Sequence, residues 1–209
     1  MYILGKKQNM TQVFDDNGRC HPVTALSVGP MTVVQVKDYS TKDKYNAVQF
    51  GYDEISLNKL DKAKRGHVAK AVGAKATGFR TLKEYRLKGE EKTDLKVGDV
   101  IDTSFLTEGD KVSVSAISKG KGFQSAIKRH GFKGQPRSHG QKHCERAPGS
   151  IGGGMRNKVP KGMRMAGRMG SDRITVKGLT IVKIDKENNL VLIRGAVPGR
   201  RGTLVEISK

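Results

Sequence analysis

Residues 118–173 read SKGKGFQSAIKRHGFKGQPRSHGQKHCERAPGSIGGGMRNKVPKGMRMAGRMGSDR. These 56 residues hold fourteen Lys or Arg against two acids, Glu145 and Asp172, so they carry +12 of the +20 of the whole chain. Twelve glycines lie among the charges, and large apolar side chains are few. Such a segment cannot bury enough apolar surface to offset the entropy of ordering its backbone. We therefore expect this basic segment to be a mobile arm by itself and to become ordered against a polyanion.

The sequence on either side of the basic segment is typical of short strands separated by turns. Strands are expected at residues 1–7, 21–28, 31–36, 45–52, 79–87, 95–101, 111–117, 174–176, 179–184, 190–193 and 203–207. Strong turn signals stand between several of them, such as Asp15-Asp16-Asn17-Gly18, Gly29-Pro30 and residues 198–202. Residues 56–72 instead show apolar side chains at helical spacing, interrupted by Gly66, and predict one or two short helices.

These patterns predict a mainly β fold with one discontinuous body. Two isolated hairpins would be marginal, so the C-terminal strands are expected to complete one sheet with the N-terminal ones. The result would be a closed or nearly closed antiparallel barrel of five to seven strands, formed by residues 1–117 and 174–209 with a helical insertion at about 56–74. The basic segment would leave this body as one long excursion, for which a binding role is the recognised reason.

The net charge of the chain limits the classes of partner that it is expected to bind. Forty basic against twenty acidic residues and a pI near 10.1 point to nucleic acid. A membrane is disfavoured because no apolar run has the length of a spanning helix and the basic segment is too rich in glycine for an amphipathic one. The N-terminus lacks the features of a signal peptide, so a cytoplasmic location is expected. The two cysteines, Cys20 and Cys144, are expected to be reduced thiols, and a disulfide between them is the less favoured alternative.

Catalytic patterns are absent. No Gly-Lys dipeptide continues into a phosphate-binding loop, and no paired carboxylates stand among other site-like residues. His139, His143 and Cys144 are the one ligand-like cluster, but a fourth ligand and an orienting group for a nucleophile are lacking. The chain is thus expected to be no enzyme and to use no metal, cofactor or small-molecule substrate.

Two features favour RNA over DNA as the polyanion. A long irregular arm without a recognition helix suits the crevices of folded RNA better than a major groove. Sparse aromatic residues argue against a single-strand binder built on stacking. The alternatives are a nucleic-acid-processing enzyme that uses the arm as a clamp, which needs a pocket, and a DNA compactor, which would bind duplex DNA as well as RNA.

A series of short motifs stands in order along the chain. They are Gly5-Lys6-Lys7, Met10-Thr11, Gln35-Val36-Lys37-Asp38, Gly66-His67, Ala69-Lys70, Lys119-Gly120-Lys121-Gly122-Phe123, Lys128-Arg129, Ser138-His139-Gly140, Pro148-Gly149-Ser150-Ile151-Gly152, Lys161-Gly162, Met165-Ala166-Gly167-Arg168-Met169-Gly170 and Gly195-Ala196-Val197-Pro198-Gly199. Together these motifs resemble the bacterial type of the large-subunit ribosomal protein L-three family. The resemblance covers essentially the whole chain.

The resemblance implies a structural constituent of the ribosome. It implies a six-stranded barrel of the translation-protein type, and a loop that runs through ribosomal RNA towards the peptidyl transferase centre. It also implies binding near the 3′ end of the large-subunit RNA early in assembly, and contact with neighbouring ribosomal proteins. The tip nearest the catalytic centre would comprise Pro148, Gly149, Ser150, Ile151, Gly152, Gly153 and Gly154. The RNA would be lined by Lys119, Lys121, Lys128, Arg129, His130, Lys133, Arg137, His139, Lys142, His143, Arg146, Arg156, Lys158, Lys161, Arg164 and Arg168.

The chain departs from the family pattern after Gly152. Some bacterial members carry a methylated glutamine there, whereas residues 153–157 read GGMRN, one residue shorter and without glutamine. The Pro-Gly often found before the Lys-Val match is also missing. We therefore expect no such methylation in this chain, and a different backbone path at the tip.

Overall fold

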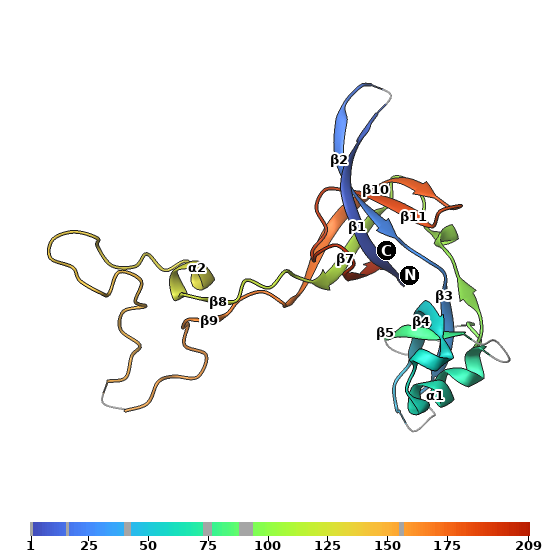
Figure 1. Cartoon of the computed structure of the whole chain (residues 1–209), viewed down its shortest axis with the longest axis horizontal. Helices are drawn as coiled ribbons and strands as arrows, with labels where there is room; N and C mark the ends of the chain where they lie inside the picture. Colours follow the sequence, from blue (N-terminus) through green and yellow to red (C-terminus); the bar gives the residue numbers. More distant parts are fainter. Residues whose placement is uncertain (1, 16, 40–42, 73–76, 88–93, 155–156) are drawn as a thin grey trace. The chain divides into compact units, whose positions relative to one another are not determined.

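The computed structural model (Figure 1) describes residues 2–15, 17–39, 43–72, 77–87, 94–154 and 157–209. Two compact units make up the chain. The first, which we call the body, contains Met1–Ala116 and Ile174–Lys209; the second is the continuous stretch Ile117–Arg173, which is the basic segment plus one residue. The chain thus leaves the body once and returns to it once.

The body is mainly β, as predicted. Its strands are β1 (Tyr2–Phe14), β2 (Cys20–Ser27), β3 (Met31–Lys37), β4 (Ala47–Ser56), β5 (Thr77–Arg86), β6 (Val100–Ile101), β7 (Lys111–Ile117), β10 (Arg173–Asp185), β11 (Leu190–Arg194) and β12 (Leu204–Ser208). Helical elements are α1 (Lys62–Val72) and two 3₁₀ turns, Leu57–Lys59 and Thr103–Phe105.

Strands from both ends of the body close on one another in a ring. In the described residues, six strands follow the closed order β1-β12-β7-β10-β11-β2. The first strand pairs with the last, Tyr2 opposite Ser208, and β11 pairs with β2, Arg194 opposite Val23. The prediction that the C-terminal strands join N-terminal ones in one sheet is confirmed for β1 and β2.

The other N-terminal strands form a separate sheet, in the order β5-β4-β3-β6. The prediction of one sheet is wrong for them, because alternation and β-propensity identify a strand but not its partner. The Gly29-Pro30 break lies between β2 in the ring and β3 in the second sheet. The turn signal that the sequence shows is therefore the point at which the chain changes sheets.

One apolar core joins the ring to the second sheet. Buried Ile3, Val114 and Ile207 from the ring belong to the same cluster as buried Phe50 from β4. The ring of Tyr2 stacks on that of Phe50 at a centroid distance of 6.0 Å. Because each fully buried aliphatic or aromatic side chain contributes about 1.5–3 kcal/mol, this shared cluster is the main source of the body's stability.

Helix α1 covers the second sheet through a smaller cluster of Val34, Val68 and Phe79. A Cβ at Gly51 of β4 would overlap the Phe79 ring, so glycine there makes room for the aromatic side chain. The helix also runs unbroken through Gly66, where the sequence predicted an interruption. Packing of Val68 outweighs the roughly 1 kcal/mol that glycine costs inside a helix. Of the predicted insertion at 56–74, residues 73 and 74 lie outside the described residues.

Most observed strands begin or end within a few residues of the predicted ranges, and three differ more substantially. β1 continues to Phe14 instead of ending at residue 7, because its polar distal half pairs with β2. The strand expected at 95–101 is reduced to β6, since Gly98 turns the chain at φ 98°. The two strands expected at 174–176 and 179–184 are one strand, β10, which passes through Gly178 at φ 73°. No helix in the described residues has the length and apolar character needed to cross a membrane.

Candidate nucleic-acid interface

The two ends of the basic segment are joined by backbone hydrogen bonds. Ser118 N–H donates to the Asp172 carbonyl at 2.9 Å, and Lys121 N–H donates to the Met169 carbonyl at 2.9 Å. Further out, β8 (Phe123–Gln124) pairs with β9 (Gly167–Arg168). The segment therefore begins as a narrow ribbon with paired backbone groups, a feature that the composition did not predict.

Glycine permits the close approach of the two chains in this ribbon. Gly170 has φ 77°, and a Cβ there would overlap the carbonyl oxygen of Lys119. Both the left-handed conformation and the missing side chain are needed at this position. We call the part from Ser118 to Gly122 and from Met169 to Asp172 the base of the segment.

A short helix, α2 (Ala126–His130), follows the ribbon. The Ser125 hydroxyl accepts from the Ile127 N–H at its start, and Gly131 ends it in the left-handed conformation at φ 74°. The long irregular segment expected from the sequence therefore contains one short helix. The cap residues Ser125 and Gly131 are a sequence signal for this helix, which the high glycine content obscured.

Most predicted RNA-lining side chains are exposed and have no partner in the part of the chain that the structure describes. The exposed residues without a side-chain contact are Lys119, Lys121, Lys128, Lys133, His139, Lys142, His143, Arg146, Lys158, Lys161, Arg164 and Arg168. Arg137 approaches Glu145 at 3.7 Å, but these side chains are 86% and 50% exposed, so the pair contributes at most about 1 kcal/mol. Arg156 lies outside the described residues. In the described residues, ten exposed Lys and Arg side chains of the segment thus have no acidic partner within the protein.

Arg129 differs from the other predicted cations. Its Nη1 donates to the Met165 carbonyl at 3.0 Å, and a Cβ at Gly167 would lie 2.8 Å from the same nitrogen. The guanidinium thus holds the outgoing chain to the returning chain. Since it is also exposed, its remaining N–H groups stay accessible to an anion.

The histidines of the segment have different environments. His130 is half-buried, and its Nε2 is buried without a hydrogen-bond partner. His139 and His143 are exposed and adopt left-handed backbone at φ 58° and 62°. Among the described residues, no group of three His, Cys, Asp or Glu side chains is placed to hold a metal ion. Cys20 and Cys144 are exposed free thiols.

The predicted tip, residues 148–154, is built from left-handed glycine turns. Gly149 and Gly152 have φ 83° and 74°, and the Gly152 N–H donates to the Ser150 hydroxyl at 3.4 Å. Ile151 is 37% exposed. Residues 148–154 therefore form a loop in which all residues but the half-buried Gly153 are exposed.

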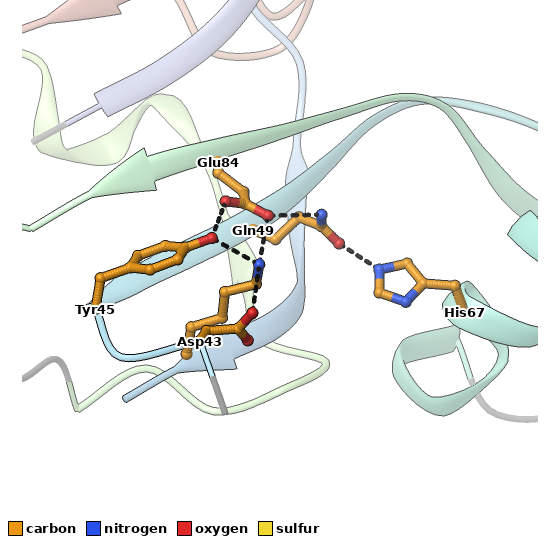
Figure 2. Close-up of polar contacts among 6 residues, drawn as sticks. Asp43, Tyr45, Gln49, His67 and Glu84 are labelled. Carbon is orange, nitrogen blue, oxygen red and sulfur yellow. Dashed lines mark hydrogen bonds and ion pairs between the residues drawn. The ribbon is translucent and has the colours of Figure 1, made fainter. Parts of the chain in front are cut away.

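A second cluster of polar residues, which no local sequence pattern indicates, lies on the body (Figure 2). Lys37 Nζ lies 2.9 Å from Glu84 Oε1 and 3.7 Å from Asp43, and it donates to the Tyr45 hydroxyl at 2.8 Å. The Tyr45 hydroxyl in turn donates to Glu84 at 3.0 Å. Two hydrogen bonds raise the pKa of Lys37 above its usual range. The bond to Tyr45 has the largest effect, and the bond to Glu84 has the next largest.

The same cluster extends to helix α1. Gln49 Nε2 donates to Glu84 at 3.4 Å, and Gln49 Oε1 lies 2.5 Å from Nε2 of His67 (Figure 2). The hydrogen bond from Lys37 lowers the pKa of the Glu84 carboxyl, against the opposing effect of partial burial. The contacts of this cluster link β3, β4, β5 and α1. Because its charges pair with each other, little charge is left to bind a ligand.

Comparison with known proteins points in one direction. The family model described as Ribosomal protein L3 matches residues 90–189. The chain is 45% identical over 208 residues to large ribosomal subunit protein uL3 of Herpetosiphon aurantiacus, covering 99% of this chain and 95% of that protein. It is 44% identical to uL3c of Guillardia theta, with 98% of each covered, and 44% identical to uL3 of Bacillus cytotoxicus, with 98% and 94% covered.

Proposed function

The chain belongs to the ribosomal protein L3 family, and from this membership we propose that its basic segment binds large-subunit ribosomal RNA. As a member of this family the chain is a structural constituent of the large ribosomal subunit and is not an enzyme. Its location is the ribosome.

The observation that carries the RNA proposal is the unpaired charge of the basic segment. Fourteen Lys or Arg stand against two acids, and twelve of the predicted contact residues are exposed without a side-chain partner in the described residues. Cations that are not compensated within the protein repel one another, and phosphates remove that repulsion. Lys and Arg on a glycine-rich backbone can also follow a closely packed phosphate surface.

We extend the proposal to the role of each part. The body would be a barrel of the translation-protein type docked at the subunit surface, which the closed order of six strands supports. The segment would penetrate the RNA, with Pro148, Gly152 and Gly154 at the tip nearest the peptidyl transferase centre. The slender, left-handed turns at residues 148–154 fit a crowded site of this kind. Binding near the 3′ end of the RNA would help to nucleate subunit assembly.

The charge count gives a quantitative test. If about eight of the cations each neutralise a phosphate, the logarithm of the affinity for large-subunit RNA falls against the logarithm of salt concentration with a slope of order −6 to −7. Filter binding of the purified chain over a salt series measures this slope. A slope shallower than about −2 would contradict the proposal, because it would leave fewer than about three phosphate contacts.

Two further measurements separate the proposal from its alternatives. Duplex DNA should compete poorly with ribosomal RNA, whereas equal competition would favour a DNA compactor. In a sucrose gradient, the chain should comigrate with the large subunit through a high-salt wash, because a segment enclosed by RNA is retained when surface contacts are screened. Complete release into the soluble fraction would count against a penetrating segment.

A further inference from the structure

The distal half of the β1–β2 hairpin pairs only with itself in the described part of the chain. β1 pairs with β12 through residues 2–6, and β2 pairs with β11 through residues 23–27. Beyond these residues, the two strands pair with each other up to Phe14 opposite Cys20. An isolated two-stranded ribbon is marginally stable in water, so a partner that covers this ribbon would stabilise it.

One face of this ribbon is uncharged and carries large, exposed apolar side chains. Met10, Gln12 and Phe14 alternate onto the same side of β1, and Pro22 and Cys20, the partners of Gln12 and Phe14, share that side. Met10 is 50% exposed and Phe14 is 61% exposed. A shallow depression is lined by Met10, Gln12, Cys20 and Pro22, together with Thr11. We call this surface the hairpin face.

The charge of the ribbon distinguishes it from the rest of the chain. Residues 8–22 contain one cation, Arg19, against Asp15 and Asp16, whereas the whole chain has twice as many cations as acids. His21 pairs with Asp15 on the opposite side. A surface that binds RNA phosphates is lined with Lys and Arg, but Met and aromatic side chains without charges are typical of the cores of protein–protein interfaces.

We propose that the hairpin face is a docking surface for a neighbouring protein of the large subunit, which places apolar side chains against Met10, Phe14 and Pro22. The inference rests on the proposed function, since the partner is available only when the chain is assembled into the subunit. The partner is a protein because the face offers apolar contact and no cation. RNA and a second copy of this chain are outcomes of the test that would overturn it.

Site-specific photo-crosslinking tests the class of partner. The chain carries benzoylphenylalanine in place of Phe14, is assembled into large subunits, purified and irradiated. A crosslink to a peptide of another large-subunit protein is expected, and mass spectrometry identifies its sequence. A crosslink to ribosomal RNA, a crosslink to a second copy, or no crosslink would overturn the proposal.

Two adjacent substitutions form a matched pair. Phe14→Glu places a negative charge on the hairpin face, whereas Val13→Glu places the same charge on the opposite side of the strand. With the photoprobe moved to Met10, Phe14→Glu should reduce the crosslink roughly tenfold and Val13→Glu less than about twofold. Equal effects would overturn the assignment to this face, and circular dichroism of the free variants excludes loss of folding as the cause.

The thiol of Cys20 provides a readout that separates this inference from the proposed function. In a Cys144→Ser background, Cys20 is the remaining thiol, and it should react with a maleimide at least about tenfold faster in the free chain than in the assembled subunit. Equal reactivity in a chain that sediments with the subunit would overturn the docking surface alone. Failure to sediment with the subunit would overturn the proposed function.

Discussion

The cations of the body and those of the basic segment have different neighbours. In the body, twenty-six Lys or Arg accompany eighteen acids, and Lys6, Lys83 and Lys209 pair with Asp53, Glu206 and Asp110 at 2.5–3.3 Å. In the basic segment, fourteen accompany two acids. The same residue types therefore have two kinds of environment: Lys side chains paired with acids join parts of the body, whereas most cations of the basic segment are exposed and, under the proposed function, bind RNA phosphates.

Neutralising cations in each region tests this comparison most strongly. The triple variant Lys121→Gln, Lys161→Gln and Arg168→Gln should bind RNA roughly a hundredfold more weakly at 0.1 M salt. The slope of log affinity against log salt concentration should become shallower by about 3, because each lost phosphate contact reduces the slope by about 1. Filter binding measures both quantities.

The control variant neutralises exposed cations of the body, at Lys62, Lys64 and Lys186. Its affinity should stay within about threefold of the unmodified chain if those residues form a solvated surface. If both triple variants lose affinity equally, the distinction between the two regions does not hold.

A substitution that leaves the charge unchanged should destabilise the base of the segment. Gly170→Ala should destabilise it by about 1–3 kcal/mol, because alanine at φ 77° is strained and its Cβ overlaps the Lys119 carbonyl oxygen. Hydrogen exchange at the Lys121 and Met169 amides should accelerate. Gly162→Ala is the matched control, since φ is 79° but the space around it is open. Equal acceleration in both variants would show that the overlap is unimportant.

The paired cluster of the body should respond to pH. The lowered pKa of Glu84 means that its contribution to stability is present above its usual value of 4.5 and is lost as pH falls through the lower folded-state value. Glu84→Gln should therefore cost about 1 kcal/mol at pH 7, with a smaller difference from the unmodified chain in acid. Urea unfolding at several pH values measures this. A difference that is constant down to pH 3 would exclude the ion pair as the cause.

The exposed ion pair of Arg137 and Glu145 should contribute least to the free energy of unfolding. Arg137→Gln and Glu145→Gln should each change the free energy of unfolding by less than about 0.5 kcal/mol, because both side chains are largely solvated. Thermal unfolding of the two variants provides the measurement. A loss above about 1.5 kcal/mol would show that the basic segment also uses internal charge pairs for stability.

The predicted strands and the observed ones agree best where the pattern is local. The alternation of Val112, Val114 and Ala116 gave β7 its correct bounds, since a strand with one buried face has a period of two. The distal half of β1 was missed because Gln8, Asn9 and Gln12 are polar and carry no such period. The separation of the second sheet was missed because pairing partners are distant in sequence.

The candidate interface was predictable as a region and less so as individual contacts. Composition alone located the basic segment, and its cations are exposed in the described residues. The contact of Arg129 with Met165 was not predictable, because it joins residues 36 positions apart. The cluster around Lys37 was missed for the same reason, since Glu84 is distant in sequence and neither residue stands in a recognisable motif.

Three properties can be read from the amino-acid sequence alone: the mainly β character of the body, the place and charge of the basic segment, and the resemblance to a ribosomal protein family. These properties are carried by composition, local periodicity and ordered motifs, which need no knowledge of long-range contacts. The three-dimensional fold was needed to see that the strands divide into a ring and a second sheet, and that Arg129 and Lys37 have partners within the protein. Which cation meets which carbonyl or carboxylate depends on how strands pair across the chain, and no local pattern records that pairing.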